Sequence, residues 1–94
     1  MDYRNEHFYG VTGREIPNQI MRHYQNGSCV FYSYNTKIAE VDIEGDVTLF
    51  YCWDMYSRTT NKYLLKFMNM KTNHHVTSIT TIRRLVKNNI FEVA

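Results

Sequence analysis

The sequence predicts an α+β domain in which a four-stranded antiparallel meander precedes two helices. Two observations predict it. Between residues 18 and 53, aromatic and β-branched residues alternate with polar ones and are interrupted by turn sequences, which is the pattern of strands in a sheet. From Thr59 onward, apolar residues recur at the three-and-four spacing of amphipathic helices. With 94 residues, 44% of them apolar, the chain is predicted to form one domain over residues 1–94 around a single core.

The first strand is predicted to follow a loose lead-in. Residues 1–13 show no clear period, so we expect them to fray. Residues 17–25 are ambiguous, because Pro17 could open a short helix with Ile20 and Tyr24 on one side, or residues 18–25 could form a strand. The following Asn26-Gly27 is typical of a two-residue hairpin turn, whose residues need positive φ, and it favours the strand.

Three further strands are predicted at residues 29–34, 37–43 and 47–53, joined by turns at Asn35-Thr36 and at residues 44–46. These turns set the register, in which Tyr32 faces Ala39 and Val41 faces both Val30 and Leu49. The expected core face of the sheet then carries these apolar residues: Val30, Tyr32, Val41, Leu49 and Tyr51. His23 also falls on the core face, where a packed or rim histidine is more common than a catalytic base.

The opposite face is expected to carry a row of Arg22, Phe31, Glu40 and Phe50. Two phenylalanines on a polar face have two explanations. The C-terminal part of the chain could cover them as a second layer, or they could form an exposed aromatic platform for a protein partner or a stacked base.

The first helix is expected over residues 59–70, with Ser57 or Thr59 as its cap and with Leu64, Phe67 and Met68 on its buried side. A second capping sequence, Thr77-Ser78, predicts another helix. Its apolar side would carry Ile79, Ile82, Leu85 and Val86, it would stop at Asn88-Asn89, and the tail at residues 90–93 could add a short edge strand.

Charge is distributed unevenly. Five acids lie within residues 40–54, whereas residues 55–91 contain no acid. Such a basic half can hold phosphates, or it can be a solvated surface that happens to be lysine-rich. Its basic residues are Arg58, Lys62, Lys66, Lys71, Arg83, Arg84 and Lys87.

The chain carries no recognisable catalytic motif. It has no glycine-rich phosphate loop, nucleophile elbow, CxxC or HExxH sequence. His74 and His75 are adjacent, which suits a solvated loop better than a metal site, and Cys29 and Cys52 are expected to be free thiols too far apart to pair. We therefore expect a protein that is not an enzyme and needs no cofactor or metal. The charged start and the lack of a long apolar run predict a cytoplasmic location.

The stretch from Ile16 to Met70 resembles a small family of uncharacterised proteins encoded by phages and other mobile elements. The resemblance rests on the SYNT sequence at residues 33–36, on Ile38-Ala39, on Trp53-Asp54 and on SRTT at residues 57–60. Here the spacing after Trp53-Asp54 is one residue longer than the commoner W-D-Y-S.

The resemblance implies a source, and small accessory proteins of such elements commonly act by binding. The leading hypothesis is therefore a non-catalytic binding protein that inhibits a host defence system, as anti-CRISPR proteins do, by contacting a host protein or ribonucleoprotein. The alternative is a nucleic-acid-binding or regulatory protein that uses the basic half, and an unrecognised enzyme is a third class. The candidate partner-binding residues are Arg22, Phe31, Phe50, Arg58, Lys62, Lys66, Arg83, Arg84 and Lys87.

Overall fold

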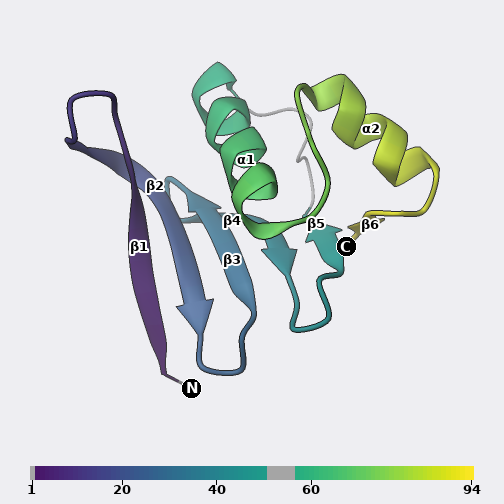
Figure 1. Ribbon diagram of the computed structural model, residues 1–94, viewed down its shortest axis with the longest axis horizontal. Coiled ribbons are helices and arrows are strands. Elements are labelled where there is room, and N and C mark those ends of the chain that lie inside the picture. The colour runs from purple at the N-terminus through teal and green to yellow at the C-terminus, as the bar shows by residue number, and fades with distance from the viewer. Residues whose placement is uncertain (1, 51–56) are drawn as a thin grey trace.

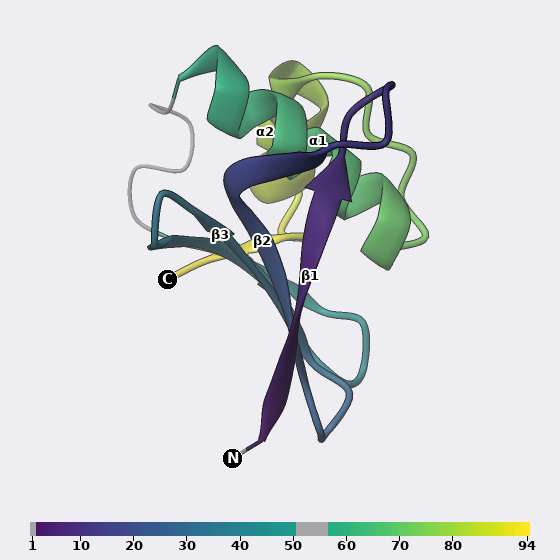
Figure 2. The same ribbon diagram turned by 90° about the vertical axis from the view of Figure 1, so that its left-hand side faces the viewer.

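The computed structural model describes residues 2–50 and 57–94 and shows a mixed sheet with two helices on one of its faces (Figures 1 and 2). The strands follow chain order across the sheet, and each of the first five pairs antiparallel with the next. The last strand instead runs parallel to its neighbour. The elements are β1 (Tyr3–Tyr9), β2 (Glu15–Tyr24), β3 (Cys29–Ser33), β4 (Thr36–Val41), β5 (Val47–Leu49), α1 (Arg58–Lys71), α2 (Ile79–Lys87) and β6 (Glu92–Val93).

The α+β class is therefore confirmed, but the described residues form a sheet of six strands rather than the expected four. Residues 1–13 were expected to be a loose lead-in, and this prediction is wrong for β1, which pairs with β2 along its length. The strand prediction for residues 18–25 is confirmed by β2. The C-terminal edge strand is confirmed by β6, and the Ala94 amide donates a hydrogen bond to the Leu49 carbonyl at 2.8 Å.

Both helices begin where a serine can cap them. The Ser57 hydroxyl accepts a hydrogen bond from the Thr60 amide at the start of α1, and Ser78 does the same for Thr81 at the start of α2. These bonds satisfy amides that have no partner within the helix, which is why the hydroxyls fix the starting points. The helix α2 ends at Lys87 with Asn88 as its cap, and the next residue, Asn89, has a φ of 59°, as expected for a helix stop.

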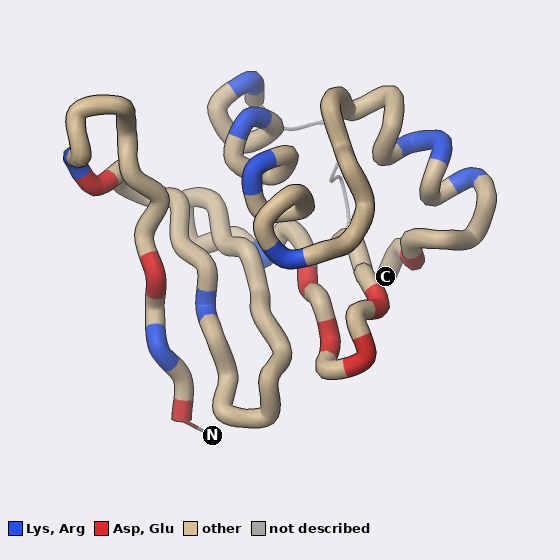
Figure 3. The backbone as a smooth tube through the Cα atoms, in the orientation of Figure 1, with Lys and Arg blue, Asp and Glu red and all other residues tan. Residues whose placement is uncertain are grey.

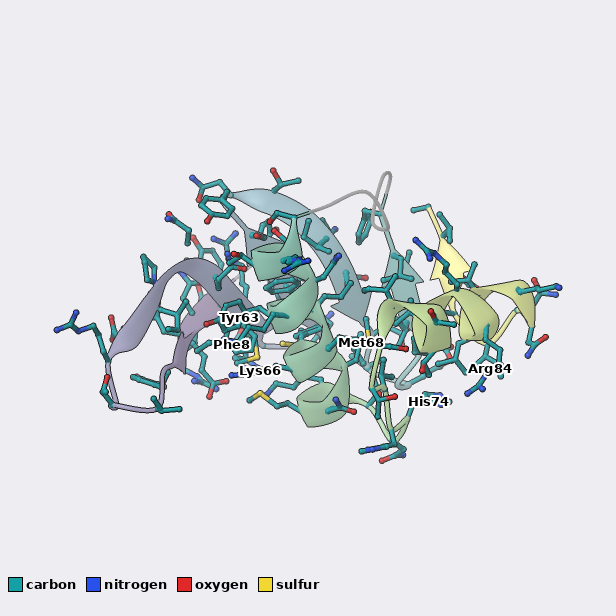
Figure 4. The ribbon with its side chains drawn as sticks, turned by 90° about the horizontal axis from the view of Figure 1, so that it is seen from above. Phe8, Tyr63, Lys66, Met68, His74 and Arg84 are labelled. Atoms are coloured by element: carbon teal, nitrogen blue, oxygen red, sulfur yellow. The ribbon has the colours of Figure 1, made fainter. Side chains whose placement is uncertain are left out.

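The core lies between the helices and the sheet. Phe31 of β3 stacks on Phe67 of α1 with ring centroids 5.7 Å apart, and Phe8 of β1 packs against Phe31 and against Tyr63 of α1. Figure 4 shows Phe8 and Tyr63 in contact beside α1. The same cluster extends to α2 through Ile82 and Leu85. The predicted buried positions of α1, which are Leu64, Phe67 and Met68, are confirmed.

The register between β2 and β3 differs from the expected one by one residue. A chain reversal does occur at Asn26-Gly27, but the Tyr24 amide bonds the Ser28 carbonyl, so the loop contains three residues rather than two. Gly27 adopts a φ of 97° there. One extra residue in a hairpin loop shifts the following strand by one position, so its side chains move to the opposite face of the sheet. Arg22 therefore pairs with Val30 and not with Phe31.

The register between β3 and β4 also differs from the expected one, by one residue in total. Its turn is formed by Tyr34 and Asn35, with φ values of 51° and 68°, one residue before the expected Asn35-Thr36. A turn moved by one residue changes the register by two, but a bulge opposite Phe31 and Tyr32 adds one residue to β4. Phe31 consequently pairs with Ala39.

The expected core face is thus correct only in part. Val41 and Leu49 lie in the core as predicted, although each pairs with a different residue, Val47 and Ala39 respectively. The assignment of Val30 and Tyr32 to the helix-covered face is wrong, and Phe31 takes that place. The remaining member of the predicted core face, Tyr51, lies outside the described residues, as does the second half of the predicted strand at residues 47–53.

Candidate binding surface

One face of the sheet is left uncovered by the helices, and we call it the aromatic face. Figure 2 shows α1 and α2 on one side of the sheet and no helix on the other. Strand pairing sets Asn5, Arg22, Val30, Glu40 and Thr48 side by side across this open side. Its aromatic and cationic side chains are Tyr3, Arg22, Tyr24, Tyr32, Lys37 and Phe50.

Arg22 is held between two rings at the centre of the aromatic face. Its Cζ atom lies 4.2 Å from the Tyr3 ring centroid and 4.7 Å from that of Tyr32. Its Nε donates a hydrogen bond to Asn5 Oδ1 at 3.1 Å, and Tyr3 meets Tyr24 edge-on with centroids 5.9 Å apart. A guanidinium fixed by two rings and a hydrogen bond has few alternative rotamers.

Burial raises the pKa of the Tyr32 phenol above its usual value, and a hydrogen bond with Tyr24 adds to this rise. The phenol therefore stays protonated at neutral pH and can donate a hydrogen bond. Beneath these side chains, Val30 is only 1% exposed although it lies away from the main core. The side chains of the aromatic face therefore pack closely over the strands and shield Val30 from solvent.

A second cation and ring pair lies on β4 and the residue after β5. The Lys37 ammonium is 4.4 Å from the Phe50 ring centroid, and it also forms an ion pair with Glu40 at 3.3 Å. Phe50 follows Leu49, whose side chain is buried, so alternation directs the Phe50 ring to the open side. The half-buried ring is available for contact from that side.

The other candidate surface is the outer side of the helices. Arg58, Lys62 and Lys66 are exposed along α1, as the spacing predicts for residues opposite the buried stripe. Arg83, Arg84 and Lys87 are exposed on α2, and Figure 4 shows Arg84 pointing away from the molecule. Figure 3 shows these blue segments on the helices, whereas many of the acidic segments gather at the turn between β4 and β5. We call these six residues the basic layer.

The sequence-predicted site residues therefore separate into three groups. Arg22 and Phe50 lie on the aromatic face as expected. Phe31 does not, because it is fully buried against Phe67: the alternative in which the C-terminal part of the chain covers the ring holds for Phe31, and its inclusion among the exposed candidate residues is wrong. The six basic residues form a surface on the helices, which cover the opposite side of the sheet.

Sequence reasoning missed much of the aromatic face. Tyr3 was overlooked because β1 was not recognised, and Tyr32 was placed in the core by the wrong register. The signal for β1 in the sequence is weak, because Tyr3, Asn5 and His7 alternate with Arg4 and Glu6, which are polar as well. This alternation contains only one buried apolar residue, Phe8, so it does not stand out as a strand.

A group of polar residues lies on the helix-covered face near the end of α1. Glu6 Oε1 is 2.6 Å from His23 Nε2 and 3.7 Å from Lys71 Nζ. The hydrogen bond from His23 lowers the pKa of Glu6, with Lys71 adding to the effect. The expected placement of His23 on the core face of the sheet is confirmed by its pairing with Cys29.

Cys29 is beside this group but lacks the properties of a nucleophile. Burial raises the pKa of its thiol to about 11, so at neutral pH the sulfur is protonated. Cys29 is free, and the expectation for Cys52 falls outside the described residues. Within residues 2–50 and 57–94, no three His, Cys, Asp or Glu side chains come together in a way that could hold a metal ion.

The fold and the two surfaces define a small α+β protein in which both described helices lie on one side of a mixed sheet. The model of a family of unknown function, DUF8033, matches residues 5–84 of the chain, and the chain belongs to that family. The comparison with curated proteins gives no match, and neither does the comparison with solved structures. None of the described helices is long and apolar enough to cross a membrane.

Proposed function

We propose that this chain is a non-catalytic binding protein that captures a partner protein on the aromatic face. The observation that carries the proposal is the uncovered cluster of Tyr3, Arg22 and Tyr32. Tyrosine and arginine are enriched among the residues that dominate binding energy at protein interfaces. A sheet face that served only as outer surface would not need them grouped in this way.

The geometry of the cluster favours binding for a second reason. Ordering a flexible side chain at an interface costs about 0.5–1.5 kcal/mol. Arg22 is already ordered by two rings and by Asn5 before any partner arrives. Much of the entropic cost of ordering the Arg22 side chain is therefore incurred when the chain folds rather than when a partner binds.

The class of partner is proposed from the sequence resemblance described above. The source that it implies, a phage or another mobile element, makes a host defence protein or ribonucleoprotein complex the expected target. The chain would then inhibit its target as anti-CRISPR proteins do, by occupying a surface that the target needs, in the cytoplasm of the host cell. This mode of action requires no catalytic residue, cofactor or metal.

A second candidate function is nucleic-acid binding through the basic layer. It is favoured by one observation, which is that residues 55–91 contain no acid to neutralise the exposed cations of the two helices. Lys62 and Lys66 have their ammonium groups 5.4 and 5.3 Å from the Tyr63 ring centroid. Such a surface would attract phosphates with a strong dependence on salt.

A pull-down from lysate of a candidate host, with and without nuclease and at two salt concentrations, tests the proposal. Capture of a protein that survives both nuclease and high salt is expected, because an interface with an apolar centre is weakly screened. Recovery that disappears with nuclease or falls steeply with salt would instead establish the second candidate. Variants of the two surfaces provide matched controls, with Phe50→Ala for the aromatic face and Lys62→Gln for the basic layer.

A further inference from the structure

The outer edge of β1 has no neighbour within the part of the chain that the structure describes. β1 is the first strand in the sheet order and pairs only with β2 (Figure 1). It is seven residues long and contains neither proline nor lysine, and its two charged residues, Arg4 and Glu6, have opposite charges and so need not repel a matching strand. Its unpaired N–H and C=O groups can therefore accept another strand.

The hydrogen bonding to β2 identifies the backbone groups that face outward. The Gln25 amide donates to the Asp2 carbonyl at 3.2 Å, and in an antiparallel ladder the bonded pairs alternate with unbonded ones. Arg4 and Glu6 thus follow Asp2 in bonding to β2. The outward groups belong to Tyr3, Asn5 and His7, which lie within the regular part of the strand, before its register shift between His7 and Tyr9.

We propose that β1 pairs antiparallel with β1 of a second copy of this chain, about a two-fold axis at Asn5. The support is charge complementarity. Arg4 and Glu6 flank Asn5 and lie on the same face of the strand. Around an axis at Asn5, Arg4 of each copy lies opposite Glu6 of the other, and opposite charges at facing positions stabilise a strand pair.

Electrostatics also selects this register over its neighbours. A slip of one residue would set outward backbone groups of one copy against inward groups of the other. A slip of two residues in one direction places Arg4 opposite Arg4, and in the other direction it places Glu6 opposite Glu6. Like charges at facing positions are destabilising, so only the register centred on Asn5 joins complementary edges.

The dimer would join two aromatic faces into one. Because the axis at Asn5 keeps the faces aligned, the helices of both copies lie on one side of the sheet. On the other side, Tyr3 of each copy comes next to His7 of the second copy. Pairing therefore extends the surface around Arg22 across the two-fold axis, independently of which partner that surface binds.

Sedimentation equilibrium of the whole chain between about 1 and 100 µM tests the proposal, since this range covers dimers of moderate affinity. The wild type is expected to dimerise, and R4E is expected to weaken dimerisation about tenfold or more, because attractive pairs become repulsive. The control is R14E, which makes the same charge change at an exposed position in the loop between β1 and β2. A second variant, Asn5→Pro, removes an outward N–H and leaves the backbone hydrogen bonds to β2 in place, although the side-chain bond from Arg22 is lost, and it should weaken the dimer too.

Mixing provides the sharpest version of the experiment. R4E carries acids at both positions and E6R carries bases at both, so each alone should dimerise at least about tenfold more weakly than the wild type, while their mixture should form a heterodimer. Glu6 also contacts His23 and Lys71, so circular dichroism must first show that E6R is folded. If E6R does not fold, the comparison of R4E with R14E decides the matter. A wild type that stays monomeric throughout, or a dimer that R4E weakens no more than R14E does, would overturn the proposal.

Discussion

Phe31 stacks on Phe67 with the ring planes 25° apart, which joins β3 to α1 at the centre of the core. Phe50, in contrast, lies on the other side of the sheet beneath the Lys37 ammonium. Two phenylalanines with similar sequence surroundings thus have different roles, one in stability and one on an accessible surface. Alanine substitution at each of the two positions distinguishes these roles.

Phe31→Ala should reduce the free energy of unfolding by about 3–5 kcal/mol, the usual cost of removing a fully buried ring. Phe50→Ala should cost no more than about 1.5 kcal/mol, because the half-buried ring loses less apolar contact. Chemical denaturation of both variants beside Leu49→Ala, a buried reference, provides the comparison. Equal losses for the two phenylalanines would show that Phe50 is covered as well and would remove it from the aromatic face.

The sequence predicts the helices better than the register of the sheet, and the reason is physical. The helices were placed correctly because capping serines and apolar spacing act locally, within a few residues. The sheet register depends on loop lengths, and one extra residue at Gln25 or one bulged residue in β4 exchanges the faces of a strand. Phe31 and Tyr32 are both aromatic, so composition alone could not reveal the exchange.

Gln19 offers a test of core polarity. It is fully buried on β2, and among the residues that the structure describes neither polar atom of its amide group has a hydrogen-bond partner. An unpaired buried amide costs about 1–3 kcal/mol, so Gln19→Met, which keeps a similar volume, should raise the free energy of unfolding by up to this amount. The control is Ser33→Ala, which breaks the 2.8 Å hydrogen bond with Thr60 and should lower stability by about 1 kcal/mol. A destabilised Gln19→Met would mean that the amide group has an essential partner.

The hydrogen bond between Glu6 and His23 predicts a pH dependence. The pKa of Glu6 is lowered in the folded state by the hydrogen bond with His23, so the folded state favours the carboxylate. The resulting stability is present above the unfolded pKa near 4.5 and is lost as the pH falls through the lower folded value. In Glu6→Gln this contribution should vanish, so wild type and variant should differ at neutral pH and converge in acid.

Denaturant titrations at a series of pH values between about 3 and 7 make this comparison, with the exposed Glu15→Gln as the control. If the difference between wild type and Glu6→Gln does not shrink in acid, the pair has another role. Glu15→Gln should show no comparable change.

The triple replacement of Arg58, Lys62 and Lys66 by glutamine should leave folding intact, because all three side chains are exposed. A melting temperature close to that of the wild type is the expected result. If nucleic acid is the partner, the triple variant should also flatten the dependence of log affinity on log salt by up to about three units. An unchanged slope would leave the basic layer as solvated surface.

The candidate site was harder to predict than the fold. Arg22 and Phe50 were correctly placed on the open side because two register errors cancelled. The register between β2 and β3 was wrong by one residue, and so was the register between β3 and β4. Tyr3 could not be placed, because an edge strand at the N-terminus needs little apolar alternation when only one end of it reaches the core. The arrangement of Tyr3, Arg22 and Tyr32 depends on three strands, so no local pattern could predict it.

The affinity of the captured partner for Tyr32→Ala tests the central claim most directly. Tyr9→Ala is the matched control, since Tyr9 is 56% exposed and lies about 20 Å along β1 from Tyr3. Isothermal titration calorimetry should show that Tyr32→Ala loses about 2 kcal/mol or more, roughly thirtyfold in affinity, while Tyr9→Ala binds like the wild type. Equal affinities for Tyr32→Ala, Tyr9→Ala and the wild type would contradict the assignment of the aromatic face as the binding surface.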